Sequence, residues 1–361
     1  MSHACALAVG FVLFLIAVAA PAVAEDAPAA GHPNLLVKVA ADGTKHEIRT
    51  AADWAAERKR ILAAMQEVMG DMPDHSRKQP LAVETVEEEA TERYVRRKIT
   101  FAVEKGDRLA AYLFLPKNRT GKLPAVLCLH PTNRELGKKI PAGLGGSYDR
   151  QYAMHLAERG YVTLAPDYVG SGDSKDFDPY ANGYTSATMK GIWNHMRCVD
   201  LLQSLPEVDP ERIGVIGHSL GGHNSMFVAV FDERIKCVVS NCGFNSFPYY
   251  MEGNLKGWSH AGYMPRIATH YDCDPKKMPF DFTEIVAALA PRPFLASAPL
   301  HDSNFAVEGV RVCIAAARPV YALHDAEDKL AANYPDCGHD FPDEPREVAY
   351  AWLDRWLKND K

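Results

Sequence analysis

The chain is organised around the stretch Ile213-Gly214-Val215-Ile216-Gly217-His218-Ser219-Leu220-Gly221-Gly222. Its apolar first half predicts a strand, and an apolar helix follows from about Ser219. A sharp turn between strand and helix lifts a serine hydroxyl clear of a sheet and places it at the positive end of the helix. Gly217 and Gly221 stand where such a turn has no room for a side chain. The stretch therefore predicts a nucleophilic serine; the alternative is a glycine-rich turn with an incidental serine.

Strand and helix patterns alternate on both sides of this stretch. Apolar runs typical of buried strands lie at 125–129, 161–165, 213–218, 236–240, 293–297 and 320–323. Helical patterns lie at 148–159, 186–205, 219–231 and 344–357, and a hairpin pattern covers 96–104 and 109–115. Alternating strands and helices form βαβ units. The sequence thus predicts an α/β fold with a mostly parallel central sheet and helices on both faces.

The N-terminal region predicts export. Residues 4–24 carry no Asp, Glu, Lys or Arg, and Ala22-Val23-Ala24 fits the small-x-small pattern of a cleavage site. We expect a signal peptide at 1–24, a leader at 25–49 and the α/β domain at 50–361, with a helical extension at 50–95. This predicts a periplasmic or extracellular protein without stable membrane association. The alternative is an uncleaved membrane anchor, because the uncharged run approaches a spanning length.

Composition narrows the possible partners. The chain has 361 residues and a formal net charge of −6, so it carries no basic signature of nucleic-acid binding. Its histidines are scattered, and no glycine-rich dinucleotide motif follows the first strands, so we expect neither a metal nor another cofactor. Removing Cys5 with the signal peptide would leave seven of the eight cysteines, hence at least one free thiol. Cys337 could pair with a neighbour near His339. The sequence does not indicate an oligomeric state.

Partners for Ser219 are sought in the order acid, then histidine. Asp302 follows the strand predicted at 293–297, and His339 lies between the last predicted strand and the terminal helix. Asp302 could also cap a helix predicted at 304–317. His324 and Asp325 follow the strand predicted at 320–323 too early to return over the serine. We therefore predict Ser219, Asp302 and His339 as a catalytic triad.

Two backbone N–H groups would stabilise the oxyanion. The first is expected from Leu220, directly after the nucleophile. The second is expected from the loop after the strand at 125–129, where Pro131 has no N–H, so Thr132 is the first candidate and Asn133 the second. His130 could contact substrate or instead shape this loop through hydrogen bonds.

Residues 243–290 interrupt the strand–helix alternation and are rich in aromatic residues and histidines. A long insertion at this place is commonly a lid or a pocket wall. Trp258 offers a flat face for a substrate ring, and Arg266 a donor for a carboxylate or hydroxyl. The alternative is that these aromatic residues only pack the insertion against the sheet.

Several motifs together resemble the α/β-hydrolase superfamily, in the branch of exported bacterial proteins similar to dienelactone hydrolase and acetyl xylan esterase. They are Gly217-His218-Ser219-Leu220-Gly221-Gly222-His223-Asn224, Leu129-His130-Pro131-Thr132, Ala165-Pro166-Asp167-Tyr168, Ala290-Pro291-Arg292-Pro293 with Asp302, and Cys337-Gly338-His339-Asp340-Phe341-Pro342. Dienelactone hydrolases use a cysteine where this chain has Ser219. The resemblance therefore implies a serine esterase acting on a small-molecule or carbohydrate ester.

Two other classes stay open. A serine peptidase of the prolyl-oligopeptidase type shares this triad order, but fewer than ~100 residues precede the hydrolase core, too few for a propeller of several four-stranded blades. A non-catalytic binding protein could use the same scaffold, although the intact Ser219, Asp302 and His339 set argues against it.

Overall fold

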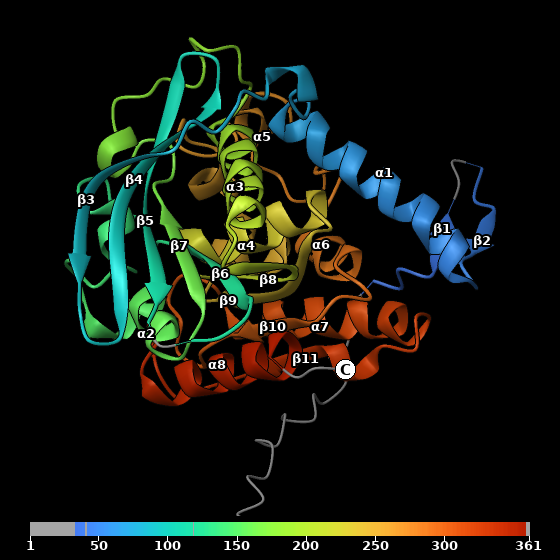
Figure 1. The fold of residues 1–361 in the computed structure, drawn as a ribbon. Helices are drawn as coiled ribbons and strands as arrows, with labels where there is room; N and C mark the ends of the chain where they lie inside the picture. The colour runs from blue at the N-terminus through green and yellow to red at the C-terminus, as the bar shows by residue number, and fades with distance from the viewer. Residues whose placement is uncertain (1–32, 40–41, 118, 359–361) are drawn as a thin grey trace, which may run out of the picture.

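A computed structural model of the protein describes residues 33–39, 42–117 and 119–358, so the signal peptide predicted at 1–24 lies outside the described residues. These residues form a nine-stranded sheet of order β11-β10-β9-β8-β6-β7-β5-β4-β3 (Figure 1). The strands are β3 (Glu84–Ala90), β4 (Tyr94–Glu104), β5 (Asp107–Pro116), β6 (Leu123–Leu129), β7 (Val162–Pro166), β8 (Val208–His218), β9 (Ile235–Asn241), β10 (Phe294–Ser297) and β11 (Leu330–Asn333). All pairings from β7 through β11 are parallel, and those among β3, β4, β5 and β7 are antiparallel.

Helices cover both faces of this sheet. One apolar cluster joins it to α1 (Ala51–Met69), α3 (Ala187–Ser204), α4 (Leu220–Phe231), α6 (Phe282–Ala288) and α7 (Val307–Ala322). A second cluster joins the other face to α2 (Tyr152–Glu158) and α8 (Asp343–Leu357). Strand β6 shows the alternation that this requires: Leu127 and Leu129 belong to the first cluster, and Val126 and Cys128 to the second. The predicted fold is confirmed.

The strand predicted at 320–323 is wrong. These residues lie at the end of helix α7, which contains Pro319, and the last strand is instead β11 at the sheet edge. A short apolar run does not distinguish a buried helix from a strand. Strand β11 reads Leu-Ala-Ala-Asn and has no β-branched residue to mark it. His324 and Asp325 therefore precede the last strand, whereas His339 follows it as predicted.

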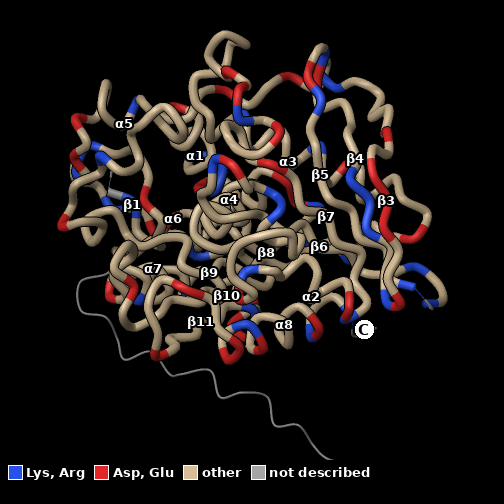
Figure 2. The backbone as a smooth tube through the Cα atoms, turned by 90° about the vertical axis from the view of Figure 1, so that its left-hand side faces the viewer, with Lys and Arg blue, Asp and Glu red and all other residues tan. Residues whose placement is uncertain are grey.

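The segment 50–95, predicted to be a helical extension, is helical only in part. Helix α1 begins with a capping box in which Asp53 N donates to Thr50 Oγ1 (3.1 Å). After the short helix η1 (His75–Arg77) the chain forms the exposed edge strand β3. Glu88 and Glu87 of β3 pair with Arg97 and Lys98 of β4 at 2.6 and 3.7 Å. Figure 2 shows these acidic and basic strands side by side. Charged edges of this kind oppose strand addition by other chains.

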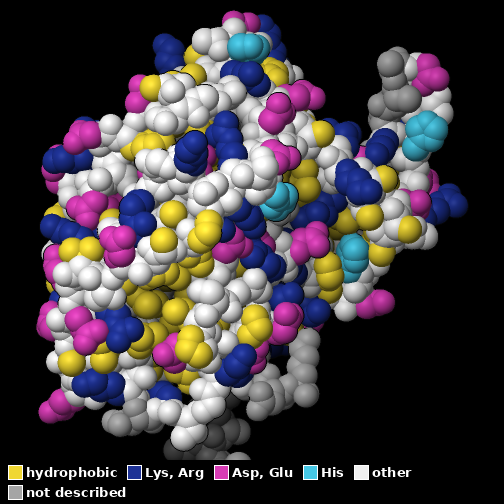
Figure 3. Space-filling model, turned by 45° about the horizontal axis from the view of Figure 1, so that its top comes forward, with side chains coloured by type: hydrophobic (Ala, Val, Ile, Leu, Met, Phe, Trp, Pro, Cys, Tyr) yellow, Lys and Arg dark blue, Asp and Glu magenta, His cyan; other side chains and the backbone are white. Residues whose placement is uncertain are grey.

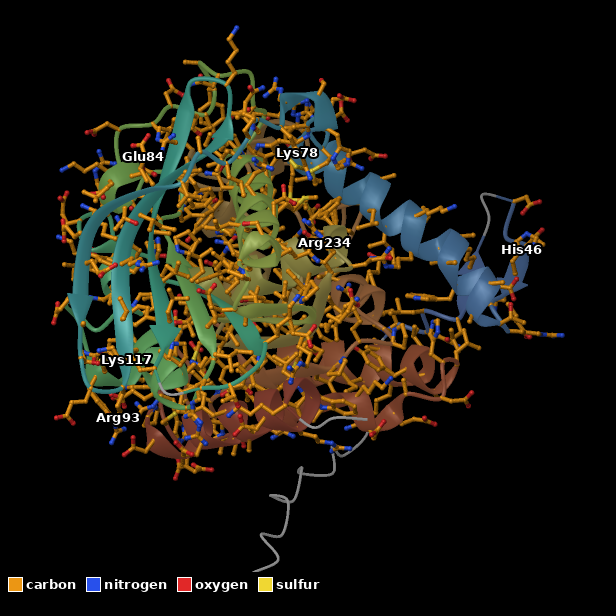
Figure 4. The ribbon with its side chains drawn as sticks, in the orientation of Figure 1. His46, Lys78, Glu84, Arg93, Lys117 and Arg234 are labelled. Atoms are coloured by element: carbon orange, nitrogen blue, oxygen red, sulfur yellow. The ribbon has the colours of Figure 1, made fainter. Side chains whose placement is uncertain are left out.

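The leader predicted at 25–49 is also partly structured. Strands β1 (Val37–Val39) and β2 (Lys45–Glu47) form an antiparallel hairpin at the outer end of α1. His46, labelled in Figure 4, marks its exposed side. In the same view Lys78 and Arg234 approach α3, where their nitrogens lie 3.1 and 2.6 Å from carboxylate oxygens of Asp200. Lys78, which follows α1, is thus linked to helix α3 through an ion-pair cluster centred on Asp200.

The surface carries mixed charge. On the face in Figure 3, basic and acidic side chains are interspersed, and apolar side chains gather in a recess in the left half of the view. Over the described ranges 33–39, 42–117 and 119–358, the structure contains no helix with the length and apolar character needed to cross a membrane.

Candidate active site

Ser219 lies in a strained turn between β8 and α4, with φ = 55°. A Cβ atom on Gly217 would lie 2.2 Å from the carbonyl carbon of Gly221, and one on Gly221 would lie 1.9 Å from the carbonyl oxygen of Leu129. Neither position can therefore hold a side chain without moving the backbone. The Ser219 N–H donates to the carbonyl oxygen of Asn241 at 2.9 Å, which fixes the turn to the neighbouring strand β9. Local packing thus accounts for both glycines of the motif.

The three residues predicted as a triad meet at the carboxyl ends of parallel strands. His339 Nε2 lies 2.9 Å from Ser219 Oγ, and His339 Nδ1 lies 2.9 and 3.0 Å from the two carboxylate oxygens of Asp302. The Asp302 side chain is 1% exposed, and that of His339 is 26% exposed. The histidine therefore connects a buried carboxylate to a serine at the surface.

Asp302 is held by its own loop. Its Oδ1 accepts hydrogen bonds from the N–H groups of Asn304 (2.8 Å) and Phe305 (3.0 Å). Helix α7 begins only at Val307, with Ala306 as its N-cap. The alternative role of Asp302 as the cap of a helix starting at 304 is therefore wrong, and its carboxylate points to the histidine.

Asn241 links the loop that carries His339 to the turn that carries Ser219 through hydrogen bonds. Its Nδ2 lies 2.7 Å from His218 Nδ1 and donates to the carbonyl oxygen of Asp340 at 3.1 Å. Arg150 Nε also donates to Asp340 Oδ1, at 3.2 Å. His218 is buried, and burial together with nearby His339 holds the pKa of its imidazole well below the usual range. His218 thus stays neutral beside the site.

His130 shapes the loop that carries Thr132. Its Nε2 accepts from the Tyr168 N–H at 2.9 Å, so Nδ1 carries the proton and donates to the Pro131 carbonyl oxygen at 2.6 Å. The side chain is 2% exposed, and burial lowers the pKa of the imidazole. Both ring nitrogens are engaged within the protein. Of the two roles considered for His130, the structure supports loop shaping and not substrate contact.

A cavity of about 420 Å³ opens beside the serine turn and is lined by both predicted oxyanion residues, Leu220 and Thr132. Its aromatic lining consists of Tyr168, Phe177, Tyr180 and Tyr263, and its charged lining consists of Arg134, Lys175 and Asp178. The segment from His260 to Tyr263, which belongs to the insertion at 243–290, forms one wall of this cavity. This size and mixture suit a polar ring-bearing ligand.

Two residues predicted to contact substrate do not line this cavity. Trp258 is 2% exposed and packs among aromatic rings, with centroids 4.8 Å from His223 and 5.4 Å from Phe282. Arg266 lies on the outer helix α5 (Arg266–Thr269), where its Nη1 donates to the carbonyl oxygen of Glu67 at 2.7 Å. The alternative reading, that the aromatic residues pack the insertion, therefore holds for Trp258.

Sequence reasoning missed the opposite wall of the cavity, the segment 168–180 after β7. Two tyrosines tie it to the insertion: Tyr168 Oη donates to the Gly262 carbonyl oxygen at 3.0 Å, and Tyr180 Oη to that of Ala261 at 2.6 Å. A signal was present, because this segment follows a buried parallel strand, and ligands collect at the carboxyl ends of such strands.

The seven described cysteines are free thiols, so Cys337 is not paired in this structure. Cys242 lies at the site: its Sγ and ligand atoms of Asp302 and His339 all fall within 4.8 Å of one another. Burial, and next the adjacent Asp302, raise the pKa of the Cys242 thiol well above its ordinary value. Cys242 is therefore a neutral thiol and not a competing nucleophile.

Comparison with known proteins assigns the chain to a family. The model of the family described as "Glucuronyl esterase, fungi" matches residues 108–324, more than half of the chain. The chain belongs to the glucuronyl esterase family. YtaP of Bacillus subtilis (strain 168), whose name describes it as a hydrolase, is 30% identical over 314 residues, covering 84% of this chain and 99% of YtaP. This esterase family membership agrees with the resemblance drawn from the sequence motifs.

Other relatives of this esterase carry carbohydrate esterase names. Acetyl esterase Axe7A of Xylanibacter ruminicola is 24% identical over 218 residues, covering 54% of this chain and 47% of Axe7A. The structure of a glucuronoyl esterase from Solibacter usitatus superposes with a TM-score of 0.68 and 19% identity, covering 90% of this chain and 99% of the other. The α/β-hydrolase fold is thus confirmed, and the enzyme is a carboxylic ester hydrolase.

Proposed function

We propose that this enzyme cleaves carboxylic esters of carbohydrates through an acyl-enzyme on Ser219. The observation that carries the proposal is the hydrogen-bonded series from Ser219 Oγ through His339 to Asp302, with donor–acceptor distances of 2.9 to 3.0 Å. A serine becomes a nucleophile when an oriented base can take its proton, and this series supplies one.

The first chemical step follows from these positions. His339 Nε2 accepts the Ser219 Oγ proton as Oγ bonds to the ester carbonyl carbon. Asp302 accepts the hydrogen bond from Nδ1, which leaves Nε2 free as a base and stabilises the imidazolium. The imidazolium then gives its proton to the leaving alkoxide, and the carbonyl reforms as the acyl-enzyme. Water, deprotonated by the same nitrogen, releases the acid and restores Ser219.

The tetrahedral intermediate needs donors that are in place beforehand. The Leu220 N–H lies at the first turn of α4, whose positive end favours negative charge. The Thr132 N–H is the second proposed donor, on the loop braced by His130. Both residues line the 420 Å³ cavity, and we propose that these two N–H groups hold the carbonyl oxygen of an ester bound there.

A carbohydrate substrate is supported by two observations. The cavity presents four aromatic side chains beside charged and backbone polar groups, a combination that suits an apolar sugar face and its hydroxyls. The family description and the names of Axe7A and the Solibacter usitatus structure refer to esters of uronic acids or acetyl groups. We therefore propose that the sugar ring, on the acyl or the alcohol side, occupies this cavity.

The test is a matched substrate panel with the purified enzyme. It comprises a methyl ester of glucuronic acid, an acetylated xylo-oligosaccharide, p-nitrophenyl acetate and a proline anilide. We expect turnover of at least one sugar ester with a higher kcat/KM than p-nitrophenyl acetate. Ser219→Ala should lower kcat by about 10⁴-fold or more at unchanged melting temperature. Preference for the anilide, or turnover that survives in Ser219→Ala, would contradict the proposal.

We further propose that the enzyme is exported and cleaved after Ala24. The support is Ala22-Val23-Ala24 after a stretch without acidic or basic residues. N-terminal sequencing of the protein from periplasmic or culture fractions should then begin at Glu25. Material that retains Met1 in the membrane fraction would instead support the anchor.

A further inference from the structure

Cys242 is a buried thiol that the proposed reaction does not use. It follows β9 with φ = 48° and is 2% exposed. Its Sγ accepts a hydrogen bond from Asn241 Nδ2 at 3.4 Å and donates to the Asp340 carbonyl oxygen at 3.4 Å. These contacts hold the sulfur beside Asp302 and His339. A sulfur, a nitrogen and a carboxylate oxygen therefore lie within 4.8 Å of one another.

We propose that Cys242, Asp302 and His339 form an inhibitory site for a thiophilic divalent cation, with Zn²⁺ as the best match. Tetrahedral zinc binds sulfur at about 2.3 Å and nitrogen or oxygen at about 2.0–2.2 Å, so its ligand atoms lie roughly 3.3–3.6 Å apart. His339 Nδ1 is 2.9 Å from Asp302 Oδ1, and no pair of the three ligand atoms exceeds 4.8 Å. Shifts of about 1 Å therefore suffice to enclose the ion.

Charge and access fit the same ion. A thiolate, a carboxylate and a neutral imidazole together balance the two positive charges of zinc, so no net charge is left in a buried place. Asp302 is 1% exposed, Cys242 2% and His339 26%, so the histidine is the most solvent-accessible of the three proposed ligands. Water would be the fourth ligand. Sulfur and imidazole favour zinc over Mg²⁺ or Ca²⁺, which prefer oxygen ligands.

Occupation of this site stops the reaction through the histidine tautomer. Zinc bonds to His339 Nδ1 in place of its proton, and a neutral ring then carries its proton on Nε2. That nitrogen lies 2.9 Å from Ser219 Oγ and becomes a donor, so it no longer accepts the serine proton. The thiol proton is released to solvent as the S–Zn bond forms. Inhibition rests on the proposed function of His339, whereas binding of the ion does not.

The first test titrates esterase activity with ZnCl₂ against p-nitrophenyl acetate, each variant being scaled to its own zinc-free rate. We expect inhibition of the wild-type enzyme that EDTA reverses and that equal Mg²⁺ does not reproduce. Cys242→Ala should raise the half-inhibiting zinc concentration by about 100-fold, because loss of even an outer partner of a metal ligand costs about 10–100-fold in affinity. Cys337→Ala is the matched control, because this more exposed thiol lies two residues before His339, and it should keep wild-type sensitivity.

The second test measures binding without activity, in Ser219→Ala loaded with Co²⁺. A thiolate-to-cobalt charge-transfer band that saturates at one ion per chain is expected, and it should disappear in the double variant with Cys242→Ala. Cys242→Ser serves if the alanine variant does not fold. A band that persists without Cys242, zinc sensitivity that follows Cys337, or no zinc effect would each overturn the site. A band in Ser219→Ala with no esterase activity in the wild type would instead contradict the proposed function alone.

Discussion

The triad and the cavity wall are neighbours at one edge of the sheet, yet they are assembled differently. Ser219, Asp302 and His339 each follow a strand of the parallel region, and side-chain hydrogen bonds of 2.9–3.0 Å join them. The wall consists of two loops, 168–180 and 260–263, joined by tyrosine hydroxyls to backbone carbonyls. The first region depends on the order of the strands, and the second on how two loops meet.

We infer from this difference that the triad governs the rate of ester cleavage and that the cavity wall governs which esters are accepted. Strand order fixes where a residue after β8, β10 or β11 lies, so substitutions in the loops leave the triad geometry in place. The wall follows β7 on one side only, and its two loops are joined by hydrogen bonds between residues 94 and 81 positions apart in the sequence. We therefore expect substitutions at the triad to lower turnover of every ester, and those at the wall to act on particular steps or substrates.

The largest expected effect is that of Asp302→Asn. An amide in this place keeps the volume of the carboxylate but carries no negative charge to stabilise the imidazolium. Its NH2 group can also donate to Nδ1, which places the ring proton on Nε2 and removes the base. We predict that kcat falls by about 10²–10⁴-fold for all esters while KM changes little. Steady-state kinetics on the substrate panel measures both constants. A loss confined to one ester would show that Asp302 belongs with the wall and not with the triad.

Trp258→Ala should reduce stability instead. Removing a buried indole leaves a cavity among His223, Phe282 and their neighbours, and such changes cost about 3–5 kcal/mol. We predict a lower free energy of unfolding in urea and the same proportional change in kcat/KM for every ester. Arg266→Ala, at a partly buried position in the same insertion, removes one hydrogen bond to Glu67; it is the control and should cost only about 1 kcal/mol. If kcat/KM in Trp258→Ala changed by different factors for different esters, Trp258 would have a role in substrate binding.

The same difference explains what the sequence could predict. The glycine–serine motif at 217–221, the apolar strands and the order of Ser219, Asp302 and His339 are sequence patterns, and the structure brings the three residues together. The strand predicted at 320–323 failed because an apolar run is compatible with the helix α7, and β11 carries almost no strand signal. The pocket roles of Trp258 and Arg266 failed because residue type does not indicate which side of an irregular loop faces the cavity.

The smallest expected effect on activity is that of Tyr263→Phe, at the contact between the cavity wall and the loop that carries Thr132. Tyr263, on the insertion, has its hydroxyl 3.2 Å from Thr132 Oγ1 on the proposed oxyanion loop. Tyr263→Phe removes this link but keeps the ring, whose centroid lies 4.3 Å from that of His260. One hydrogen bond of this kind contributes about 1 kcal/mol, so we predict a fall in kcat of about 5-fold at unchanged melting temperature.

The kinetic constant that changes in Tyr263→Phe, kcat or KM, distinguishes positioning of the oxyanion loop from substrate binding. If Tyr263 holds Thr132 in place, kcat should fall by the same factor for all esters, because each one forms an oxyanion. If its hydroxyl contacts the sugar, KM should rise for sugar esters and stay unchanged for p-nitrophenyl acetate. Tyr249→Phe is the matched control, since Tyr249 is 41% exposed in the same insertion and does not line the cavity. If Tyr263→Phe and Tyr249→Phe changed kcat and KM equally, the insertion would affect the catalytic residues through packing alone.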